Sequence, residues 1–537
     1  MRLVKAAEMR EMDLEATNRY SIPGLILMEN AGLSIVQVII DRFFKNRVQG
    51  KKVFIIAGPG NNGGDGFVVG RHLFNRGVDV EFLITTVPEY YRGDAAVNFK
   101  IIHDMGLPCQ VLNPDNIQDL SAVMKKSDLI VDALFGTGFK GVAKEPLASL
   151  IKVVNESGKP VLAVDIPSGL EADTGQAAGE CIYASVTVTM GMSKIGLHLE
   201  PGVQYAGDVV VGDISFPPEL KSENNGDYYL IDEQMVKKAL PERRPTNHKG
   251  DFGHVAVVGG TRGYTGAAAL ASNAALRGGA GLVTAVVPDQ LYPVAAAKLT
   301  EAMTYPAPGS AGGGFSRSAY EFIKQVLERA SVFAVGPGFG QEEETAIFLE
   351  DLLIKTNRPL VLDADALNIL AGRRHLLAGA DLSDQRTRWV LTPHPGEMAR
   401  LLGTSISEIQ ADRLGVAARA SREWGTVVVL KGARTVIASP EGPLFINPTG
   451  NPGLATGGTG DVLTGLIASL LAQGLVPMWA AVCGVFIHGL AADQIALKKG
   501  MAGMIAGDLL DEIPVVLRSL AAIEKRGRKE NEATSLG

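Results

Sequence analysis

Short runs of apolar, often β-branched residues alternate with segments of helical character along the whole chain, and this alternation limits the possible folds more than any other feature. Alternating strands and helices are typical of parallel sheets that helices cover on both faces. The pattern therefore predicts an α/β protein. In the first half, the predicted strands are Val53–Ala57, Val80–Ile84, Leu129–Asp132, Val161–Asp165, Val186–Met190 and Val209–Gly212. In the second half, they are Val255–Val258, Leu282–Val287, Val332–Val335, Leu360–Asp363, Val390–Thr392 and Val427–Leu430.

The length of the chain predicts two domains. Its 537 residues exceed the roughly 250–300 residues at which single hydrophobic cores stop growing. The polar stretch Glu219–Asp227 interrupts the alternation and is the predicted linker, and a helix over Asp232–Leu240 is expected after it. We predict one domain over residues 1–222, a second over residues 223–525, and a polar tail over residues 526–537. The halves show no convincing internal repeat, which favours two different α/β domains.

The composition excludes several classes of protein. Apolar residues make up 46% of the chain and charged residues 20%, so each half can bury a core. Lys and Arg number 51 against 58 Asp and Glu, and this acidic surplus argues against nucleic acid as a partner. The three cysteines are far apart and the N-terminus shows no apolar targeting segment, so we expect a cytoplasmic protein.

One stretch, Val462–Ile487, has no acidic, basic or histidine residue and is long enough to span a bilayer. Gln473, Gly474 and Pro477 interrupt it, which favours two buried helices joined by a turn. We therefore expect no membrane partner.

A glycine-rich loop follows the predicted strand Val53–Ala57 and opens a helix. Gly58, Gly60 and Gly63 fit the pattern G-x-G-x-x-G, in which backbone N–H groups approach a phosphate at a helix N-terminus. The loop departs from the dinucleotide fingerprint, because the next strand is followed by threonines rather than an acidic residue, and it lacks the lysine of a P-loop. Its further polar residues are Asn61, Asn62 and Asp65. A tight turn that merely requires glycine is the alternative.

Polar residues also follow other predicted strands of the first half. Asp132 and Asp165 stand at strand ends, and Ser168 follows shortly after. Because the carboxyl ends of parallel strands meet at one edge of an open sheet, we expect these residues to converge there with Asn62. Hard oxygen ligands of this kind suit an alkali or alkaline-earth ion. The alternative is that each aspartate caps a helix.

The strongest signal lies late in the second half, where a glycine-rich turn runs directly into an apolar helix. Gly457, Gly458 and Gly460 precede Asp461. Backbone N–H groups at such a helix start can stabilise charge developing on a phosphoryl group, and an aspartate there can accept the proton of an attacking hydroxyl. The alternative is that Asp461 only caps the helix.

The first half resembles the NAD(P)HX epimerase family over residues 1–218. The motifs that carry the resemblance are LMENAG (Leu27–Gly32), GPGNNGGDG (Gly58–Gly66), DALFGTG (Asp132–Gly138), DIPSGL (Asp165–Leu170) and GMSKIGL (Gly191–Leu197). The resemblance implies a Rossmann-like three-layer αβα domain that interconverts the R and S epimers of hydrated NADH and NADPH, called NADHX and NADPHX. It implies a K⁺ ion held by Asn62, Asp132 and Ser168. The substrate-binding residues that it implies are Asn61, Asn62, Gly63, Gly64, Asp65, Gly136, Thr137, Gly138, Phe139, Lys140, Gly141, Val142 and Asp165.

Epimerisation at a carbinolamine-like carbon requires proton transfer, for which a carboxylate and a cationic acid are a natural pair. Asp165, at the position of the family's substrate-contacting aspartate, and Lys194 are the candidate catalytic residues of this half. The alternative for Lys194 is a solvated loop lysine.

The second half resembles the NAD(P)H-hydrate dehydratase family, which has the ribokinase-like fold, over residues 226–520. Its motifs are HKGDFGHVAVVGG (His248–Gly260), YTGAA (Tyr264–Ala268), VGPGFG (Val335–Gly340), LDADALN (Leu362–Asn368), TPHPGEMARLL (Thr392–Leu402), LKGARTVI (Leu430–Ile437) and the turn before Asp461. The resemblance implies a ribokinase-like αβα domain in which Ala267, Gly338, His394 and Asp461 contact the hydrated cofactor. The residues that it implies for binding an adenine nucleotide are Lys431, Gly432, Ala433, Arg434, Thr435 and Gly460. His394 could instead cap the following helix, in whose first turn Glu397 could act through Mg²⁺.

Together the two resemblances predict a bifunctional enzyme that repairs NADHX and NADPHX. Phosphorylation of the ring hydroxyl creates a leaving group, so a kinase-like fold can carry out a lyase reaction. The resemblances imply K⁺ for the first half, Mg²⁺ for the second, and ADP as the phosphate donor, with ATP possible. An ATP-dependent ribokinase-type kinase of a small molecule is the alternative, and so is a first half that only binds a ligand and regulates the second. We expect a homo-oligomer.

Overall fold

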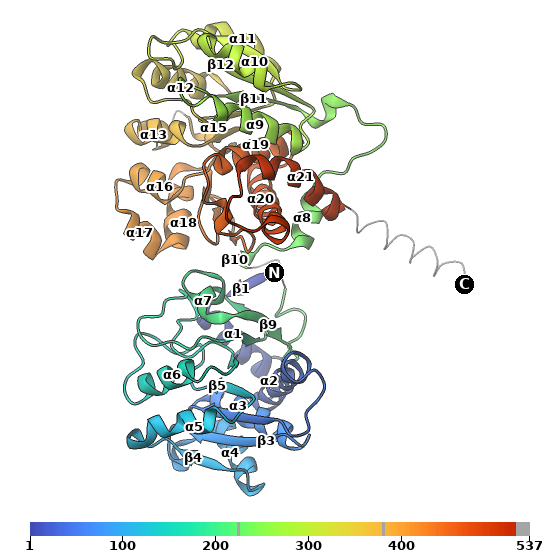
Figure 1. Ribbon diagram of the computed structural model, residues 1–537, viewed down its shortest axis with the longest axis vertical. Coiled ribbons are helices and arrows are strands. Elements are labelled where there is room, and N and C mark those ends of the chain that lie inside the picture. Colours follow the sequence, from blue (N-terminus) through green and yellow to red (C-terminus); the bar gives the residue numbers. More distant parts are fainter. Residues whose placement is uncertain (223–225, 379–381, 522–537) are drawn as a thin grey trace, which may run out of the picture. The chain divides into compact units, whose positions relative to one another are not determined.

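The computed structural model describes residues 1–222, 226–378 and 382–521. It divides into two compact units, Met1–Tyr228 and Tyr229–Gly537, coloured blue to green and green to red in Figure 1. The predicted boundary after residue 222 lies shortly before this division. The predicted tail, residues 526–537, and part of the predicted linker lie outside the described residues. The expected α/β architecture in two units is confirmed.

The first unit is built on an open parallel sheet with strand order β4-β3-β2-β5-β6-β7-β9. Its strands are β4 (Cys109–Val111), β3 (Asp79–Ile84), β2 (Lys52–Ala57), β5 (Leu129–Ala133), β6 (Val161–Val164), β7 (Val186–Met190) and β9 (Asp208–Gly212). Its helices are α1 (Ala6–Asn18), α2 (Gly24–Val38), α3 (Asn61–Phe74), α4 (Gly93–Asp104), α5 (Leu120–Met124), α6 (Leu147–Glu156) and α7 (Gly202–Ala206).

Strand β2 shows how this sheet comes to lie between two helical layers. Val53, Ile55 and Ala57 belong to the core formed with α2, α3 and α4, whereas Phe54 and Ile56 belong to the core formed with α6. Successive strand residues point to opposite faces, and here both faces are apolar because both are covered. The unit is thus a three-layer αβα structure (Figure 1).

A short parallel pair of strands positions helix α1. β1 (Arg2–Val4) pairs with β8 (Ser193–Lys194), with Val4 opposite Lys194. The N–H of Ala6 donates to Asp173 Oδ1 at 2.6 Å and fixes the start of α1. The first helix of the chain is therefore held beside the segment that carries Lys194.

The second unit contains a larger sheet with the order β13-β12-β11-β14-β15-β16-β17-β18-β19, parallel as far as β17 and antiparallel after it. Its strands are β13 (Met303–Ala307), β12 (Leu282–Pro288), β11 (His254–Val258), β14 (Val332–Val335), β15 (Leu360–Leu362), β16 (Trp389–Leu391), β17 (Val427–Leu430), β18 (Val436–Ala438) and β19 (Leu444–Ile446). The short strand β10 (Tyr228–Leu230) spans the point of division between the units.

Helices cover both faces of this sheet as well. One core is formed with α9 (Thr265–Arg277), α19 (Thr459–Ala472), α20 (Pro477–Lys499) and α21 (Ala506–Ala521). The other is formed with α11 (Ala319–Arg329), α12 (Glu343–Lys355), α13 (Asp365–Gly372), α16 (Pro395–Leu402) and α18 (Arg413–Trp424). The remaining helices are α8 (Glu233–Ala239), α10 (Tyr292–Lys298), α14 (His375–Ala378), α15 (Ser383–Arg386) and α17 (Ile406–Ala411).

The uncharged stretch of the second half forms most of α19 and the first half of α20, with a turn between them, as predicted. By length and composition alone, Gly24–Phe43 and Pro477–Lys499 could each cross a membrane. However, 72% of the apolar window in Pro477–Lys499 is buried within the protein, which is typical of a core helix.

Three predicted strands, β6, β15 and β16, end one residue early, and the first two leave an aspartate just beyond the strand. β6 ends at Val164 because Asp165 adopts φ +66°, a left-handed conformation that is uncommon outside glycine. β15 ends at Leu362, before Asp363. Both aspartates belong to the candidate sites described next.

Candidate active sites

A cavity of 890 Å³ opens at the carboxyl ends of the strands of the first unit. Its walls come from α1, from α2, from the glycine-rich loop before α3, and from the loop that follows β5. The predicted site residues that line it are Asn61, Asn62, Asp65, Gly136, Thr137, Gly138, Phe139, Lys140, Asp165 and Lys194. The structure therefore brings together most of the predicted substrate-binding residues of this half.

Asp165 and Lys194 form an ion pair in this cavity. Lys194 Nζ lies 2.5 Å from Asp165 Oδ1 and also donates to the backbone carbonyl of Met190 at 2.8 Å. The lysine side chain is 1% exposed and that of the aspartate is 14% exposed. Lys194 is thus buried and paired, which excludes the alternative of a solvated loop lysine. Asp165 Oδ1 also accepts hydrogen bonds from Thr189 Oγ1 and from the N–H of Met190.

Three more carboxyl groups, those of Asp13, Asp65 and Asp94, line the same cavity. Asp65 was predicted, but Asp13 of α1 was not. Burial, together with Asp165 and Asp13, raises the pKa of Asp65 well above its usual range. Burial also raises the pKa of Asp13 to about 6; Lys194 lowers it and Asp165 adds to the rise. The cavity therefore combines one buried cation with carboxyl groups that retain protons more strongly than in water.

The three predicted K⁺ ligands meet around the backbone of Phe135. Asn62 Nδ2 donates to the carbonyl of Phe135 at 2.8 Å, and the N–H of Phe135 donates to Ser168 Oγ at 2.9 Å. Ser168 Oγ donates to Asp132 Oδ1 at 2.6 Å, and the Ser168 N–H donates to Asp132 Oδ2 at 2.8 Å. Asn62 lines the 890 Å³ cavity together with Asp165, whereas Asp132 and Ser168 bond each other and are not among the residues that line it.

The other predicted residues of this half, in the first turn of α3 and in the loop after β5, do not line the cavity. A side chain at Gly63 would collide with the carbonyl of Gly58 at 2.0 Å, and one at Gly64 would meet Met28. Gly141 adopts φ +80° and its N–H donates to Glu171 Oε1, while Val142 is 56% exposed. Gly63 therefore does satisfy a tight turn, which was the alternative interpretation of the loop, although Asn61, Asn62 and Asp65 beside it face the cavity.

In the second unit, a charged network lies beyond the carboxyl ends of β15 and β17. Lys431 Nζ lies 2.7 Å from Asp363 Oδ1 and 3.8 Å from Glu397 Oε2. Asp363 Oδ2 accepts a hydrogen bond from Thr464 Oγ1 of α19 at 2.7 Å. Burial lowers the pKa of Lys431, but Asp363 and Glu397 outweigh this effect and raise it. Asp363 and Thr464 were not predicted as site residues, although the motif LDADALN contains Asp363.

Asp461 lies in the first turn of α19, beside this network. Gly458, at φ +92°, is the N-cap residue, and no side chain caps the helix. Within the described residues, the N–H groups of Gly458, Gly460 and Asp461 make no hydrogen bond. Burial raises the pKa of Asp461 to about 7; Asp363 adds to the rise and Lys431 opposes it. Asp461 is therefore not a capping residue, and free donors and a basic carboxylate occur together.

His394 and Glu397 form a capping box at the start of α16. His394 Nδ1 accepts from the N–H groups of Gly396 and Glu397, and Glu397 Oε2 accepts from the N–H of His394 at 2.8 Å. Burial lowers the pKa of His394 and raises that of Glu397 to about 7. The alternative role of His394 as a helix cap is thus observed, and its side chain remains 49% exposed beside the network.

Two further predicted contacts of the hydrated cofactor adjoin each other. A Cβ at Gly338 would lie 3.2 Å from the Cβ of Ala267, in the first turn of α9. Gly340, two residues after Gly338, donates its N–H to Asp365 Oδ2. The negative charge of Asp365 in turn contributes to the raised pKa of Asp461. The Gly338 loop is therefore connected to the surroundings of Asp461.

The predicted nucleotide loop joins β17 to β18. It consists of Lys431, Gly432, Ala433, Arg434 and Thr435. Gly432 and Arg434 both have positive φ, and Thr435 Oγ1 donates to the carbonyl of Gly432 at 3.0 Å. A Cβ at Gly460 would lie 3.6 Å from Lys431 Nζ, so this loop and the start of α19 lie next to each other.

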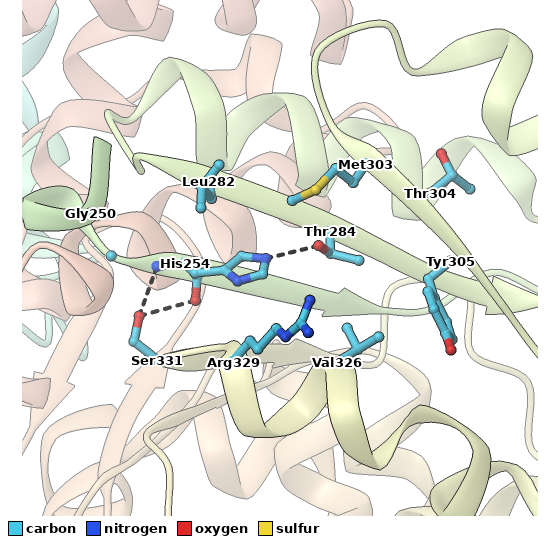
Figure 2. Close-up of a pocket in the computed structure, with 11 residues that line it drawn as sticks. Gly250, His254, Leu282, Thr284, Met303, Thr304, Tyr305, Val326, Arg329 and Ser331 are labelled. Carbon is cyan, nitrogen blue, oxygen red and sulfur yellow. Dashed lines mark hydrogen bonds between the residues drawn. The ribbon is translucent and has the colours of Figure 1, made fainter. Parts of the chain in front are cut away.

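A second cavity, of 520 Å³, lies at the opposite ends of the strands, where β11 and β12 begin (Figure 2). His254 Nε2 lies 2.8 Å from Thr284 Oγ1, and Ser331 Oγ bonds both the N–H and the carbonyl of His254 (Figure 2). No predicted site residue lines this cavity. It is therefore separate from the chemistry around Asp461.

Each α/β unit has an ion pair beyond the carboxyl ends of its parallel strands, where ligands bind in open α/β sheets, so the fold defines a class of α/β proteins with one candidate site in each unit. Residues 255–515 match the sequence model of a family described as NAD(P)H-hydrate dehydratase, and residues 24–196 match that of the YjeF-related protein N-terminus. The chain belongs to the family of bifunctional NAD(P)H-hydrate repair enzymes.

Relatives match over nearly the whole chain. It is 47% identical over 521 residues to the bifunctional NAD(P)H-hydrate repair enzyme Nnr of Moorella thermoacetica, with 97% of each chain covered. It is 34% identical over 532 residues to the enzyme of the same name from Escherichia coli, with 98% of this chain and 96% of that one covered. Among solved structures, it is similar to the ADP/ATP-dependent NAD(P)H-hydrate dehydratase of Bacillus subtilis co-crystallised with ATP and Mg²⁺. That match has 30% identity and a TM-score of 0.46 and covers 56% of this chain and 100% of the other.

Proposed function

We propose that the second unit dehydrates the S epimer of NADHX and NADPHX with ADP as the phosphate donor, and that the first unit interconverts the R and S epimers. The observation that carries the proposal is Asp461, which lies beside unbonded helix N–H groups and the Lys431–Asp363 ion pair. These are the groups that a phosphoryl transfer to a ring hydroxyl requires.

The chemistry of the second unit follows from these groups. Asp461 accepts the proton of the ring hydroxyl as its oxygen attacks the terminal phosphorus of ADP, and AMP leaves. The N–H groups of Gly458 and Gly460 stabilise the charge on the transferred phosphoryl oxygens. Loss of phosphate from the ring, with loss of a ring proton, then restores NADH or NADPH. Lys431, held by Asp363, balances the charge of the nucleotide phosphates.

The residues near Asp461 fit a Mg²⁺ ion that is held largely by the nucleotide. Among the described residues, no group of three or more His, Cys, Asp and Glu side chains could hold a metal. Magnesium usually takes one or two carboxylates together with phosphate oxygens and water. Glu397, whose carboxylate lies 3.8 Å from Lys431, is the proposed protein ligand. When bound, the ion would neutralise charge on the phosphates.

The first unit fits the epimerase. Asp165 and Lys194 supply a carboxylate and a cationic acid in one cavity, and epimerisation requires both a proton donor and a proton acceptor. The cavity of 890 Å³ lies within the range of cavities that hold small ligands and cofactors, roughly 300–1,000 Å³.

The K⁺ site also fits the residues present. Asp132 is 1% exposed, and within the described residues its carboxylate has hydrogen-bond donors but no cationic partner. A buried carboxylate without a counter-charge is costly. K⁺ held by Asp132, Ser168 and the free oxygen of Asn62 would supply that charge and order the loop around Phe135.

The test uses the purified S epimer with ADP or ATP and follows dihydronicotinamide absorbance together with the nucleotide products. We expect one AMP and one phosphate for each NADH formed from ADP. A stable phosphorylated product without NADH would instead support the alternative of a small-molecule kinase.

A further inference from the structure

Helix α1 forms one wall of the epimerase cavity, although no sequence motif pointed to it. The residues of α1 that line the cavity are Met9, Arg10, Asp13, Leu14 and Thr17. Residues three and four apart share a helix face, so this spacing shows that one face of α1 is turned to the cavity. The pairing of Val4 with Lys194 sets the position of that face relative to the catalytic lysine.

The carboxyl group of Asp13 stands without a hydrogen-bond or ion-pair partner in the part of the chain that the structure describes. Within the described residues, no hydrogen bond or ion pair reaches its side chain, and only its backbone carbonyl accepts a bond, from Thr17 Oγ1. In contrast, Asp165 Oδ1 accepts three bonds. A partly buried carboxyl group without a partner costs folding free energy. We therefore expect that the side chain of Asp13 does not stabilise the fold.

Burial, more than the charges that face it, leaves Asp13 able to hold or release a proton near pH 6. The titratable groups that line the cavity with it are Arg10 of α1, Asp65 of α3, Asp94 of α4, Lys140 of the loop after β5, Asp165 and Lys194. The one buried cation, Lys194, is already paired with Asp165. Burial raises the pKa of Asp13 to about 6, Lys194 lowers it, and Asp165 adds to the rise.

Asp165 alone is poorly suited to be the base of the reaction. Its Oδ1 already accepts hydrogen bonds from Lys194, from Thr189 and from the N–H of Met190, so this oxygen has no place for a further proton donor. In the epimerase proposed above, this pairing makes Asp165 the residue that orients the ammonium group of Lys194 rather than the proton acceptor. A second carboxylate is needed to take the proton of the hydroxyl group.

We propose that Asp13 is that second carboxylate, a catalytic residue that exchanges a proton with the ring hydroxyl while Lys194 exchanges one with the ring nitrogen. The proposal rests on the epimerase function proposed above. Asp13 removes the hydroxyl proton, the bond between the ring nitrogen and the hydroxyl-bearing carbon breaks, and Lys194 protonates the nitrogen. The resulting aldehyde rotates, the nitrogen attacks its other face, and both protons return. No atom or electron is gained or lost.

The test compares Asp13→Asn with Glu11→Gln, a matched control that removes an exposed carboxyl from the same helix outside the cavity. Conversion of the R to the S epimer is followed without nucleotide, because the dehydratase is inactive without a phosphate donor. We expect the rate of D13N to fall by about 10²-fold or more and that of E11Q to stay unchanged. The wild-type rate should rise with pH through an apparent pKa near 6, and D13N should lose this rise.

The Tm of D13N shows whether the role of Asp13 is catalytic or structural. D13N should keep the wild-type Tm or raise it, and should keep its dehydratase activity. A lower Tm with a parallel loss of rate would overturn the proposal, and so would a D13N rate within a few-fold of wild type with the same pH dependence. If the wild-type chain does not interconvert the epimers at all, it is the proposed function that fails.

Discussion

Lys431 Nζ lies 2.7 Å from Asp363 Oδ1, and this ion pair joins the chain beyond β17 to the chain beyond β15. Because Asp363 also accepts a hydrogen bond from Thr464, the pair ties both strand ends to helix α19, whose first turn carries Asp461. The position of the proposed catalytic base therefore depends on a pair whose side chains are 19% and 2% exposed.

Breaking this pair should lower both the stability and the activity of the second unit. Asp363→Asn leaves Lys431 with the more distant carboxylate of Glu397, 3.8 Å away, and removing one member of a buried pair costs about 3 kcal/mol. Urea denaturation measures the loss. Asp511→Asn, which removes an exposed partner of Arg277, is the control and should cost less than about 1 kcal/mol. Equal stability of D363N and wild type would contradict the structural role of the pair.

Asp461→Asn should abolish the dehydratase and leave the epimerase intact. The amide cannot accept the hydroxyl proton, so the rate with ADP and the S epimer should fall by about 10²–10⁴-fold. The R-to-S conversion of the same preparation is the internal control. Loss of both activities together would contradict two independent sites.

The dehydratase should become faster as the pH rises through about 7. Burial raises the pKa of Asp461 to about 7, and only its ionised form can accept a proton. For a single group of this kind, the rate at pH 8 should be about tenfold the rate at pH 6. The check is a profile of kcat against pH, and a rate that falls over this interval would exclude Asp461 as the base.

The epimerase should require K⁺, whereas omission of K⁺ should affect the dehydratase less. Ser168→Ala removes the hydroxyl that bonds Asp132, and we expect it to raise the K⁺ concentration needed for half-maximal rate by about tenfold or more. Ser121→Ala, on α5, is the matched control. The measurement is the epimerase rate across Li⁺, Na⁺, K⁺, Rb⁺ and Cs⁺. Equal rates in all of them would contradict the ion site.

The sequence predicted the central strands and the edge strand β9, but it missed the edge strands β4 and β13. Buried central strands such as β2 and β17 are continuous apolar runs that can be recognised locally. In contrast, β4 is short and exposed, and β13 contains Pro306, which is tolerated in an edge strand, so neither shows a clear pattern. The pair formed by β1 and β8 could not be predicted, because it depends on contacts between distant segments.

The same distinction holds for the sites. Asp461 and Asp165 were predictable because glycines or strand ends mark their positions in the sequence. Asp13 and Thr464 lie inside ordinary helices, and only the tertiary fold brings them to the cavity and to Asp363. Local motifs therefore identified the loops of both sites but not the helix faces that complete them.

The central claim is that one chain carries both activities at separate sites. The most direct measurement is to incubate the pure protein with a mixture of the R and S epimers and ADP, with K⁺ and Mg²⁺, and to follow dihydronicotinamide absorbance to its end point. We predict that the whole mixture is converted to NADH or NADPH. Recovery that stops at the fraction present as the S epimer would contradict the account.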